Sequence, residues 1–172
     1  MKRQSIEIEG FHHDAPIPSA SKIGPFVVSS VIAGKDPKTG KVPDGIEEQC
    51  ALVFLHLRRI IEAASGTTDD ILKLTVWLKD GAHRKVLNQE WLKMFPDEAS
   101  RPARHTFSGQ ELPGNMLVQV EFWLRKRAIP ITRRLTPITV MTFTTSRGPR
   151  AHATKSGRAS INRRWVRSSC GS

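Results

Sequence analysis

The spacing of the apolar residues changes from helical to alternating in the middle of the chain, and this change limits the possible folds more than any other feature. Across residues 46–64 the apolar side chains recur every three or four positions, which predicts one long amphipathic helix. Across residues 71–79 they alternate with polar side chains, which predicts a strand that buries every second residue from Leu72 to Leu78. A helix followed directly by such a strand predicts a helical layer packed on a sheet.

Two local signals set the ends of this helix. Asp44 is a suitable N-cap residue, and Glu47 three positions later completes a capping box. Gly66 suits the position after the last helical turn, where the backbone commonly adopts a positive φ. We therefore predict a helix that begins after Asp44 and ends before Gly66.

Shorter patterns predict the rest of the core. The apolar spacing predicts a second helix across residues 83–95, and Pro96 ends it, because proline cannot continue a helix. The remaining strands are expected at residues 5–9, 26–32, 104–107 and 117–123. The resulting order, β-β-α-β-α-β-β, predicts an α+β fold with two helices on one face of a mixed sheet. The other face has no cover within the chain, which predicts association with further copies.

The charge of the chain is divided between two regions. Residues 1–124 hold 15 basic and 16 acidic residues, a net charge of −1, whereas residues 125–172 hold 12 basic residues and no acidic one. We therefore predict a domain over residues 1–126 and a basic, disordered C-terminal extension over residues 127–172. Two explanations of the extension stay open. It is either an arm that binds nucleic acid or another polyanion, or a segment translated in an altered frame.

Several classes of protein are excluded by simple features of the sequence. No run of apolar residues approaches the length of a membrane span, and the N-terminus lacks the apolar core of a signal peptide. The two cysteines, Cys50 and Cys170, are too few for a disulfide framework, and Cys50 lies on the apolar face of the first helix. The adjacent His12 and His13 have no second cluster with ligand spacing, so we predict no metal site. These features favour a cytoplasmic protein.

A guanidinium and a carboxylate stand out near the C-terminal end of the domain. Arg104 follows Pro102 at the start of a predicted strand, and Glu121 projects from the less apolar face of the last strand. On spacing alone, the pair is interpreted as a surface ion pair between adjacent strands. The alternative is an anion site, because a guanidinium offers two parallel donors to a carboxylate. Asn88 on the second helix is interpreted, on sequence alone, as a solvated surface residue.

The order of short motifs over residues 17–124 resembles that of the reactive intermediate deaminase family (RidA, YjgF-like; also called liver perchloric-acid-soluble proteins). Each motif alone is weak, but their order and spacing together are specific. The matching residues are Ile23-Gly24-Pro25-Phe26, Asp36-Pro37-Lys38-Thr39-Gly40, Ile46-Glu47-Glu48-Gln49, Ile60-Ile61-Glu62-Ala63-Ala64, Asp70-Ile71-Leu72-Lys73-Leu74-Thr75-Val76, Asn88, Phe95-Pro96, Pro102-Ala103-Arg104, Leu112-Pro113 and Val120-Glu121.

The resemblance implies a fold, an assembly and an activity. Members of the family are chorismate-mutase-like α+β domains that form homotrimers with clefts between subunits. They hydrolyse 2-enamino and 2-imino acids to 2-keto acids and ammonia, with no cofactor. By resemblance, Arg104 would bind the substrate carboxylate and Glu121 would serve as the acid/base carboxylate. The residues that would line the cleft are Gly24, Phe26, Asn88 and Thr106. The implied partners are further copies of the chain and a small carboxylate-bearing substrate, with no membrane, and nucleic acid only through the basic extension.

The sequence also departs from the family pattern. Phe26 stands where many members have Tyr, Ser30-Val31-Ile32 stands where many have Ser-Gly-Gln, and Thr106 stands where Cys is common. These changes leave the exact substrate open. They also leave two other functions open: a non-catalytic trimer that binds a small ligand, and an RNA-binding or endoribonuclease activity that would use the basic extension.

Overall fold

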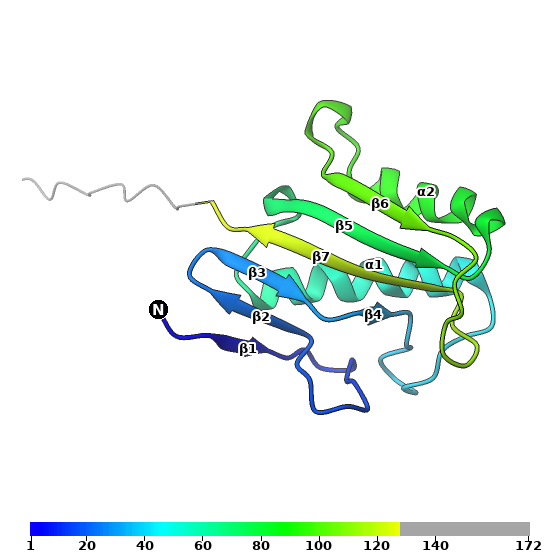
Figure 1. The fold of residues 1–172 in the computed structure, drawn as a ribbon, viewed down its shortest axis with the longest axis horizontal. Helices are drawn as coiled ribbons and strands as arrows, with labels where there is room; N and C mark the ends of the chain where they lie inside the picture. Colours follow the sequence, from blue (N-terminus) through cyan, green and yellow to red (C-terminus); the bar gives the residue numbers. More distant parts are fainter. Residues whose placement is uncertain (128–172) are drawn as a thin grey trace, which may run out of the picture. The chain divides into compact units, whose positions relative to one another are not determined.

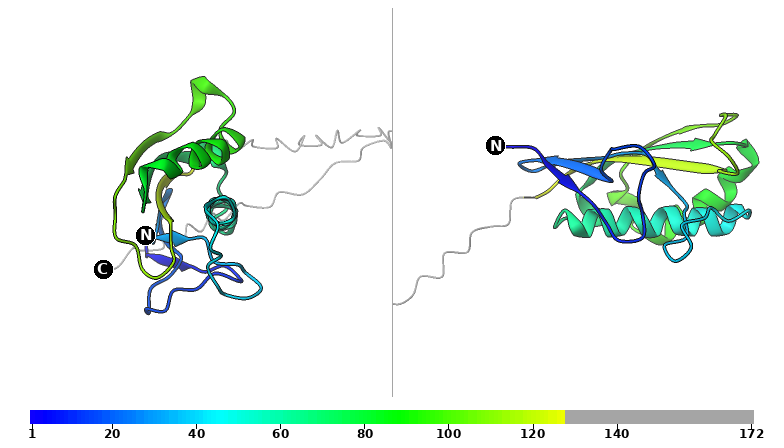
Figure 2. Two further views of the ribbon diagram at one scale, coloured as in Figure 1. Left: turned by 90° about the vertical axis from the view of Figure 1, so that its right-hand side faces the viewer. Right: turned by 90° about the horizontal axis from the view of Figure 1, so that it is seen from below.

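The computed structural model describes residues 1–127, which form one mixed sheet and two helices (Figure 1). The strands are β1 (Gln4–Ile6), β2 (Ala20–Ile23), β3 (Phe26–Ser29), β4 (Ile32–Ala33), β5 (Ile71–Leu78), β6 (Ala103–Phe107) and β7 (Val118–Arg125), and the helices are α1 (Ile46–Ala63) and α2 (Arg84–Met94). The strand order is β1-β2-β3-β7-β5-β6, with β4 also paired to β7. Both helices lie on one face of the sheet (Figure 2), as predicted for the α+β class.

The direction of the strands follows from their connections. β5 and β6 are parallel because α2 connects them, whereas every other described pair is antiparallel. β7 lies in the middle of the sheet, between β3 and β5, although it comes last in the chain. β6 is the edge strand, and β5 separates it from β7. This order matters for the site, because the two candidate residues lie on β6 and β7.

The N-terminal strands differ from the prediction. β2 was not predicted; it pairs with β3 through the two-residue turn Gly24-Pro25, where Gly24 has a φ of +56°. A hairpin of this kind needs a positive φ at its first central residue, which glycine adopts without strain. The single strand predicted across residues 26–32 is interrupted at Ser30, whose hydroxyl donates to the carbonyl of Pro18 at 2.6 Å. The predicted strand across residues 5–9 is shorter and ends at Ile6.

The ends of α1 also differ in detail from the prediction. Gly45 is the N-cap, no side chain caps the helix, and Asp44 instead accepts a hydrogen bond from Asn115 at 3.1 Å. At the C-terminus Ser65, not Gly66, has the positive φ, of 59°. The backbone N–H groups of Ser65 and Gly66 donate to the carbonyls of Glu62 and Ile61, which is the Schellman arrangement.

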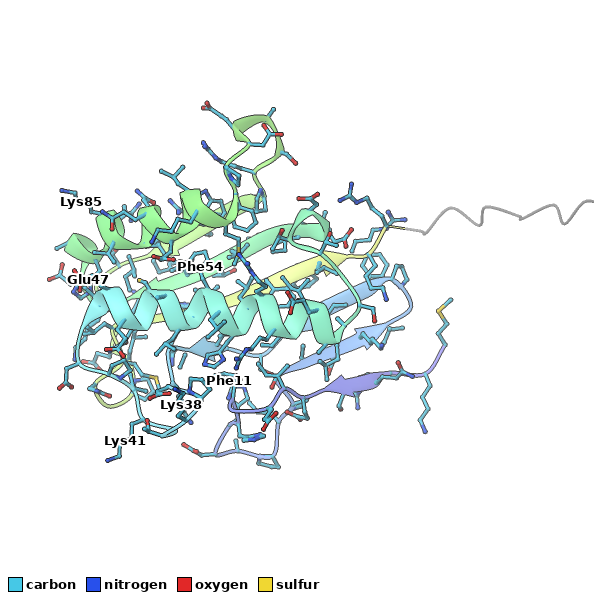
Figure 3. All side chains as sticks on the ribbon, turned by 180° about the vertical axis from the view of Figure 1, so that it is seen from behind. Phe11, Lys38, Lys41, Glu47, Phe54 and Lys85 are labelled. Atoms are coloured by element: carbon cyan, nitrogen blue, oxygen red, sulfur yellow. The ribbon has the colours of Figure 1, made fainter. Side chains whose placement is uncertain are left out.

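One face of α1 packs on the sheet as predicted. Figure 3 views the molecule from the helical side, with Phe54 and Phe11 on the two sides of α1. The buried apolar residues of α1 are Cys50, Val53, Phe54, Leu57, Ile60 and Ile61. Burial raises the pKa of the Cys50 thiol to about 12, so this cysteine is an inert core residue.

Two buried polar side chains of α1 anchor neighbouring loops. Gln49 donates to the carbonyls of Pro43 and Asn115 at 2.6 and 3.0 Å and accepts from the backbone N–H of Leu117 at 2.8 Å. These bonds connect the start of α1 to the segment that enters β7. The Nε2 atom of His56 lies 2.6 Å from the carbonyl oxygen of Lys35 and so fixes the segment after β4.

β5 follows the predicted alternation except at its start. Leu74, Val76 and Leu78 are fully buried, but Leu72 is 54% exposed. A bulge between Ile71 and Lys73 shifts the pairing with β7 and turns Leu72 away from the core. The prediction that Leu72 is buried was therefore wrong.

The described part of the chain has no helix that is long and apolar enough to cross a membrane. The predicted basic extension lies outside the described residues, apart from its first member, Arg127. The Arg127 side chain donates to the carboxylates of Asp70 and Asp69, at 3.2 Å in each case. These bonds fix the chain directly after β7 to the start of β5.

Candidate active site

Arg104 lies on β6 with its side chain under α2. It pairs in register with Leu74, which is buried beneath the helices, so both side chains lie on the helix-covered face. Its Nη2 atom donates to Oδ1 of Asn88 at 2.8 Å. Its Cζ atom lies 4.6 Å from the centre of the Trp91 ring, the distance of a cation–π contact. The edge strand and one helix therefore hold the guanidinium from two sides.

The guanidinium of Arg104 has an N–H donor that is not used in a hydrogen bond within residues 1–127. Its Nη1 atom is buried and has no hydrogen-bond partner in the described part of the chain. Among residues 1–127, no carboxylate forms an ion pair with Arg104. Burial, and to a smaller extent the positive charge of Arg84, lower the pKa of Arg104. A partly buried cation with an unused donor and no counter-ion is the pattern of an anion-binding group.

Asn88 and Thr106 lie on the same side of the sheet as Arg104. Thr106 follows Arg104 by two positions in β6 and pairs with buried Val76, so its side chain points to the helix-covered face. The interpretation of Asn88 as a solvated surface residue was wrong, because Asn88 is half-buried and accepts the bond from Arg104. The structure thus brings three predicted residues together: Arg104, Asn88 and Thr106.

Glu121 lies on the opposite face of the sheet. Its neighbours in β7, Val120 and Phe122, are fully buried under the helices, so Glu121 points the other way. It pairs with Thr75 of β5 and forms no ion pair among residues 1–127. The interpretation of Arg104 and Glu121 as a surface ion pair was therefore wrong. Their strands are separated by β5, and their side chains emerge on opposite faces.

The face that carries Glu121, which we call the open face, is rich in aromatic side chains. Trp77 stacks on Phe107 with ring centres 6.3 Å apart, and Phe107 stacks on His105 at 4.2 Å. Phe26 and Trp123 are each 54% exposed on this face. Phe26 begins β3 directly after the Gly24-Pro25 turn, so the predicted residues Phe26 and Gly24 lie on β3 and at its entry, apart from the Arg104 group.

Sequence reasoning missed two residues of the site. Trp91 lies three positions after Asn88 on α2, so one helical face presents both to Arg104. Its spacing was typical of a core residue, and it is indeed nearly buried, at 7% exposed. Arg84 lies four positions before Asn88 on the same helix. The i, i+4 spacing of Arg84 and Asn88 indicated that they share one face of the helix. No pattern in the sequence indicated that this face lies against β6.

Comparisons with known proteins agree on the extent and fold of the domain that the structure describes. Residues 13–124 match the family model described as Endoribonuclease L-PSP. A RutC family protein of Aquifex aeolicus is 33% identical over 112 residues, which are 62% of this chain and 90% of that protein. The 2-iminobutanoate/2-iminopropanoate deaminase of Salmonella typhimurium is 30% identical over 100 residues, 58% of this chain and 78% of that protein. The crystal structure of RidA from an Antarctic Psychrobacter superposes with a TM-score of 0.66 at 29% identity, covering 71% of this chain and 98% of that one.

Proposed function

The chain belongs to the Endoribonuclease L-PSP family, which includes the RidA proteins, and we propose from this premise that it is a cofactor-independent enamine/imine deaminase. Its substrates would be reactive 2-enamino and 2-imino acids, and its products 2-keto acids and ammonia. The reaction would take place at clefts between the subunits of a homotrimer. The observation that carries the proposal is the half-buried guanidinium of Arg104 on one face of the sheet, which has no ion-pair partner within residues 1–127, with Glu121 on the other face.

Arg104 is suited to hold the substrate carboxylate. Its bond to Asn88 and its contact with Trp91 restrict the side chain before any ligand arrives. A carboxylate could then receive two parallel N–H bonds at little further entropic cost. The same charge would withdraw electrons from the imine carbon next to the carboxylate and so favour attack by water.

Glu121 of the same chain cannot reach that substrate, because the sheet itself lies between them. A second copy is the simplest source of the carboxylate. The open face supports such an assembly, because it exposes three aromatic side chains, Phe26, Trp123 and Phe107, among its polar ones. The edge of β6, which carries Arg104, has no neighbouring strand in the described chain. A cleft between two copies would join Arg104 of one to Glu121 of the other.

The chemical step needs only a positioned water and a proton carrier. The enamine first tautomerises to the imine, and water then adds to the imine carbon to give a carbinolamine. The C–N bond breaks, the nitrogen leaves as ammonia, and the hydroxyl proton is lost as the keto group forms. Glu121 would orient the water, take up its proton and return a proton to the departing nitrogen, which is general acid–base catalysis.

Two other functions each have one observation in their favour. A trimer that only binds a small ligand is favoured by Phe26, since a phenyl ring can line a cleft but cannot donate a hydrogen bond. Binding or cleavage of RNA is favoured by the description of the matching family model and by the 12 basic residues of residues 125–172. RNA binding through those residues would weaken steeply with salt.

A coupled assay tests the proposal. An amino-acid oxidase generates the imine in situ, semicarbazide traps the fraction not yet hydrolysed, and the protein competes with the trap. We expect the protein to lower the yield of semicarbazone, and Arg104→Ala to restore it. A matched control is Arg58→Ala, which removes an exposed arginine of α1. If the wild-type protein leaves the yield unchanged but still binds keto acids, the ligand-binding alternative replaces this one.

A further inference from the structure

A second guanidinium lies next to the Arg104 group. Arg84 begins α2 and lies one helical turn before Asn88, so the two side chains share a helical face. Asn88 contacts Arg104 at the start of β6, and the Nη2 atom of Arg84 donates to the hydroxyl of Ser108, directly after β6, at 3.2 Å. The same helix and strand therefore carry two polar contacts. The contacts are four residues apart on each element, about 6 Å along α2 and about 13 Å along β6.

The two cations are close enough to affect each other. The charge of Arg84 contributes to lowering the pKa of Arg104, and no acidic group acts in the opposite direction there. Among residues 1–127, neither guanidinium forms an ion pair with a carboxylate. Arg84 is exposed, and a single neutral bond to Ser108 leaves most of its donors unused. Two neighbouring cations without a counter-ion would be stabilised by a ligand with two negative charges.

We propose that Arg84 binds a second anionic group of the substrate. The preferred substrates are then imines of dicarboxylic amino acids, such as the imine of aspartate, over imines of neutral amino acids. This inference rests on the proposed function. The α-carboxylate binds Arg104 and the side-chain carboxylate binds Arg84, one helical turn away. The second carboxylate takes no part in the bond changes, so Arg84 determines specificity and is not a catalytic residue.

A purely structural role for Arg84 makes a different prediction. If Arg84 only connected α2 to the end of β6, loss of its bond to Ser108 would have the same effect as loss of the arginine. Ser108→Ala removes that bond and keeps the charge. Lys85→Leu removes a neighbouring positive charge whose side chain points away from the molecule (Figure 3). These two variants separate the structural link and the overall charge from a specific contact.

The first measurement is a ratio of rates. The coupled assay gives kcat/KM for the imines of aspartate and of leucine with the wild type and with Arg84→Leu, Ser108→Ala and Lys85→Leu. Loss of one charged hydrogen bond predicts that Arg84→Leu lowers the aspartate-to-leucine ratio about 10- to 100-fold. Ser108→Ala and Lys85→Leu should keep the ratio within about threefold of the wild type. A wild type that prefers the leucine imine, or an unchanged ratio in Arg84→Leu, overturns the inference.

The second measurement does not depend on catalysis. Titration calorimetry compares the binding of oxaloacetate with that of 4-methyl-2-oxopentanoate, which are the corresponding keto acids. We expect oxaloacetate to bind more tightly, and Arg84→Leu to remove most of the difference while Lys85→Leu keeps it. Failure of the deaminase proposal would leave this binding difference in place. Equal binding of the two keto acids to the wild type would overturn the inference whatever the assay shows.

Discussion

The two faces of the central sheet differ in what covers them and in which side chains they expose. The covered face packs Leu74, Val76 and Phe122 under α1 and α2, and it holds the one candidate group with defined partners, Arg104. The open face exposes more than half of Phe26 and Trp123, and its candidate group, Glu121, has no ion-pair partner within residues 1–127. The covered face is protein interior except at its β6 edge, and the open face combines exposed aromatic side chains with charged ones.

This difference assigns different roles to the two candidate residues. Arg104 is oriented by its own chain, so it can bind a carboxylate as soon as one arrives. Glu121 has a fixed backbone in the centre of the sheet, but within residues 1–127 it has no ion-pair partner that would fix its side chain. We propose that a second copy of the chain places its Arg104, with the bound substrate, next to Glu121.

The largest effect is expected from the two candidate residues themselves. Arg104→Ala should lower kcat/KM about 100- to 10,000-fold, because two charged hydrogen bonds to the substrate are lost. Arg104→Lys should recover little, because an ammonium cannot form the bidentate pair. Glu121→Gln should lower kcat about 100- to 10,000-fold and change the affinity for keto acids little, because the role we propose for Glu121 is proton transfer. Steady-state kinetics together with keto-acid titration measure both effects.

Folding serves as the control for these variants. Arg104 and Glu121 are both only half-buried, so neither substitution should unfold the domain. Circular dichroism and the thermal midpoint should stay close to those of the wild type. Glu62→Gln, which neutralises an exposed carboxylate of α1, should keep full activity. Wild-type rates in Arg104→Ala would rule out its role as the carboxylate-binding residue.

The next effect concerns assembly. Trp123→Asp places a charge in the exposed aromatic part of the open face, and we expect it to weaken association by about 2 kcal/mol or more. Leu55→Asp makes the same kind of change on the outer side of α1, where Leu55 is 37% exposed, and should not affect association. Sedimentation equilibrium should give about three times the chain mass for the wild type and for Leu55→Asp. A wild type that sediments as a monomer contradicts the intersubunit site.

Much of the fold could be predicted from the sequence because its strongest signals are periodic. The apolar stripe of α1 and the alternation of β5 and β7 identified these elements and the face that each one buries. The errors occur where a tertiary contact competes with the pattern. Ser30 interrupts a strand by bonding to Pro18, and a bulge exposes Leu72. Such contacts join segments distant in sequence, so propensity cannot reveal them.

The candidate site could be predicted only residue by residue. Arg104 and Glu121 were identified by their chemistry and by the family resemblance, but their spatial relation was not. Spacing in the chain suggested adjacent strands, whereas β7 pairs with β5 and leaves β6 at the edge. The face of each side chain depends on this order. Trp91 was not identified as a site residue, because a residue that packs and also contacts a guanidinium has the same helical spacing as one that only packs.

The smallest effect is that of pH on the free energy of unfolding, and it arises from two histidines with lowered pKa values. His56 is fully buried, and burial is the main cause that lowers its pKa from 6.5, with a smaller contribution from Arg59, although its bond to Lys35 acts in the opposite direction. The pKa of nearby His13 is also lowered, again mainly by burial. The folded state therefore binds fewer protons than the unfolded state below pH 6.5. Stability should be complete above that pH and decrease as the pH falls below it, until the folded-state pKa is reached.

Urea unfolding at about pH 7.5 and about pH 5.5 tests this dependence. The wild type should have the lower unfolding free energy at the acidic pH. In His56→Gln an amide can replace the bond to Lys35 without a titrating group, so the decrease should be smaller and should reflect mainly His13. A decrease equal to that of the wild type would show that His56 does not cause the pH dependence.

The central claim is that each cleft joins Arg104 of one copy to Glu121 of another, and subunit mixing tests it most directly. Arg104→Ala and Glu121→Gln are each expected to be inactive. When the two are unfolded together in equal amounts and refolded, each mixed trimer should contain one cleft with both residues intact, which is about a quarter of all clefts. The account predicts about a quarter of the wild-type activity from two inactive proteins, while each variant refolded alone stays inactive. Mixed trimers with no activity above that of the separate variants would show that both residues act within one chain, and would contradict the account.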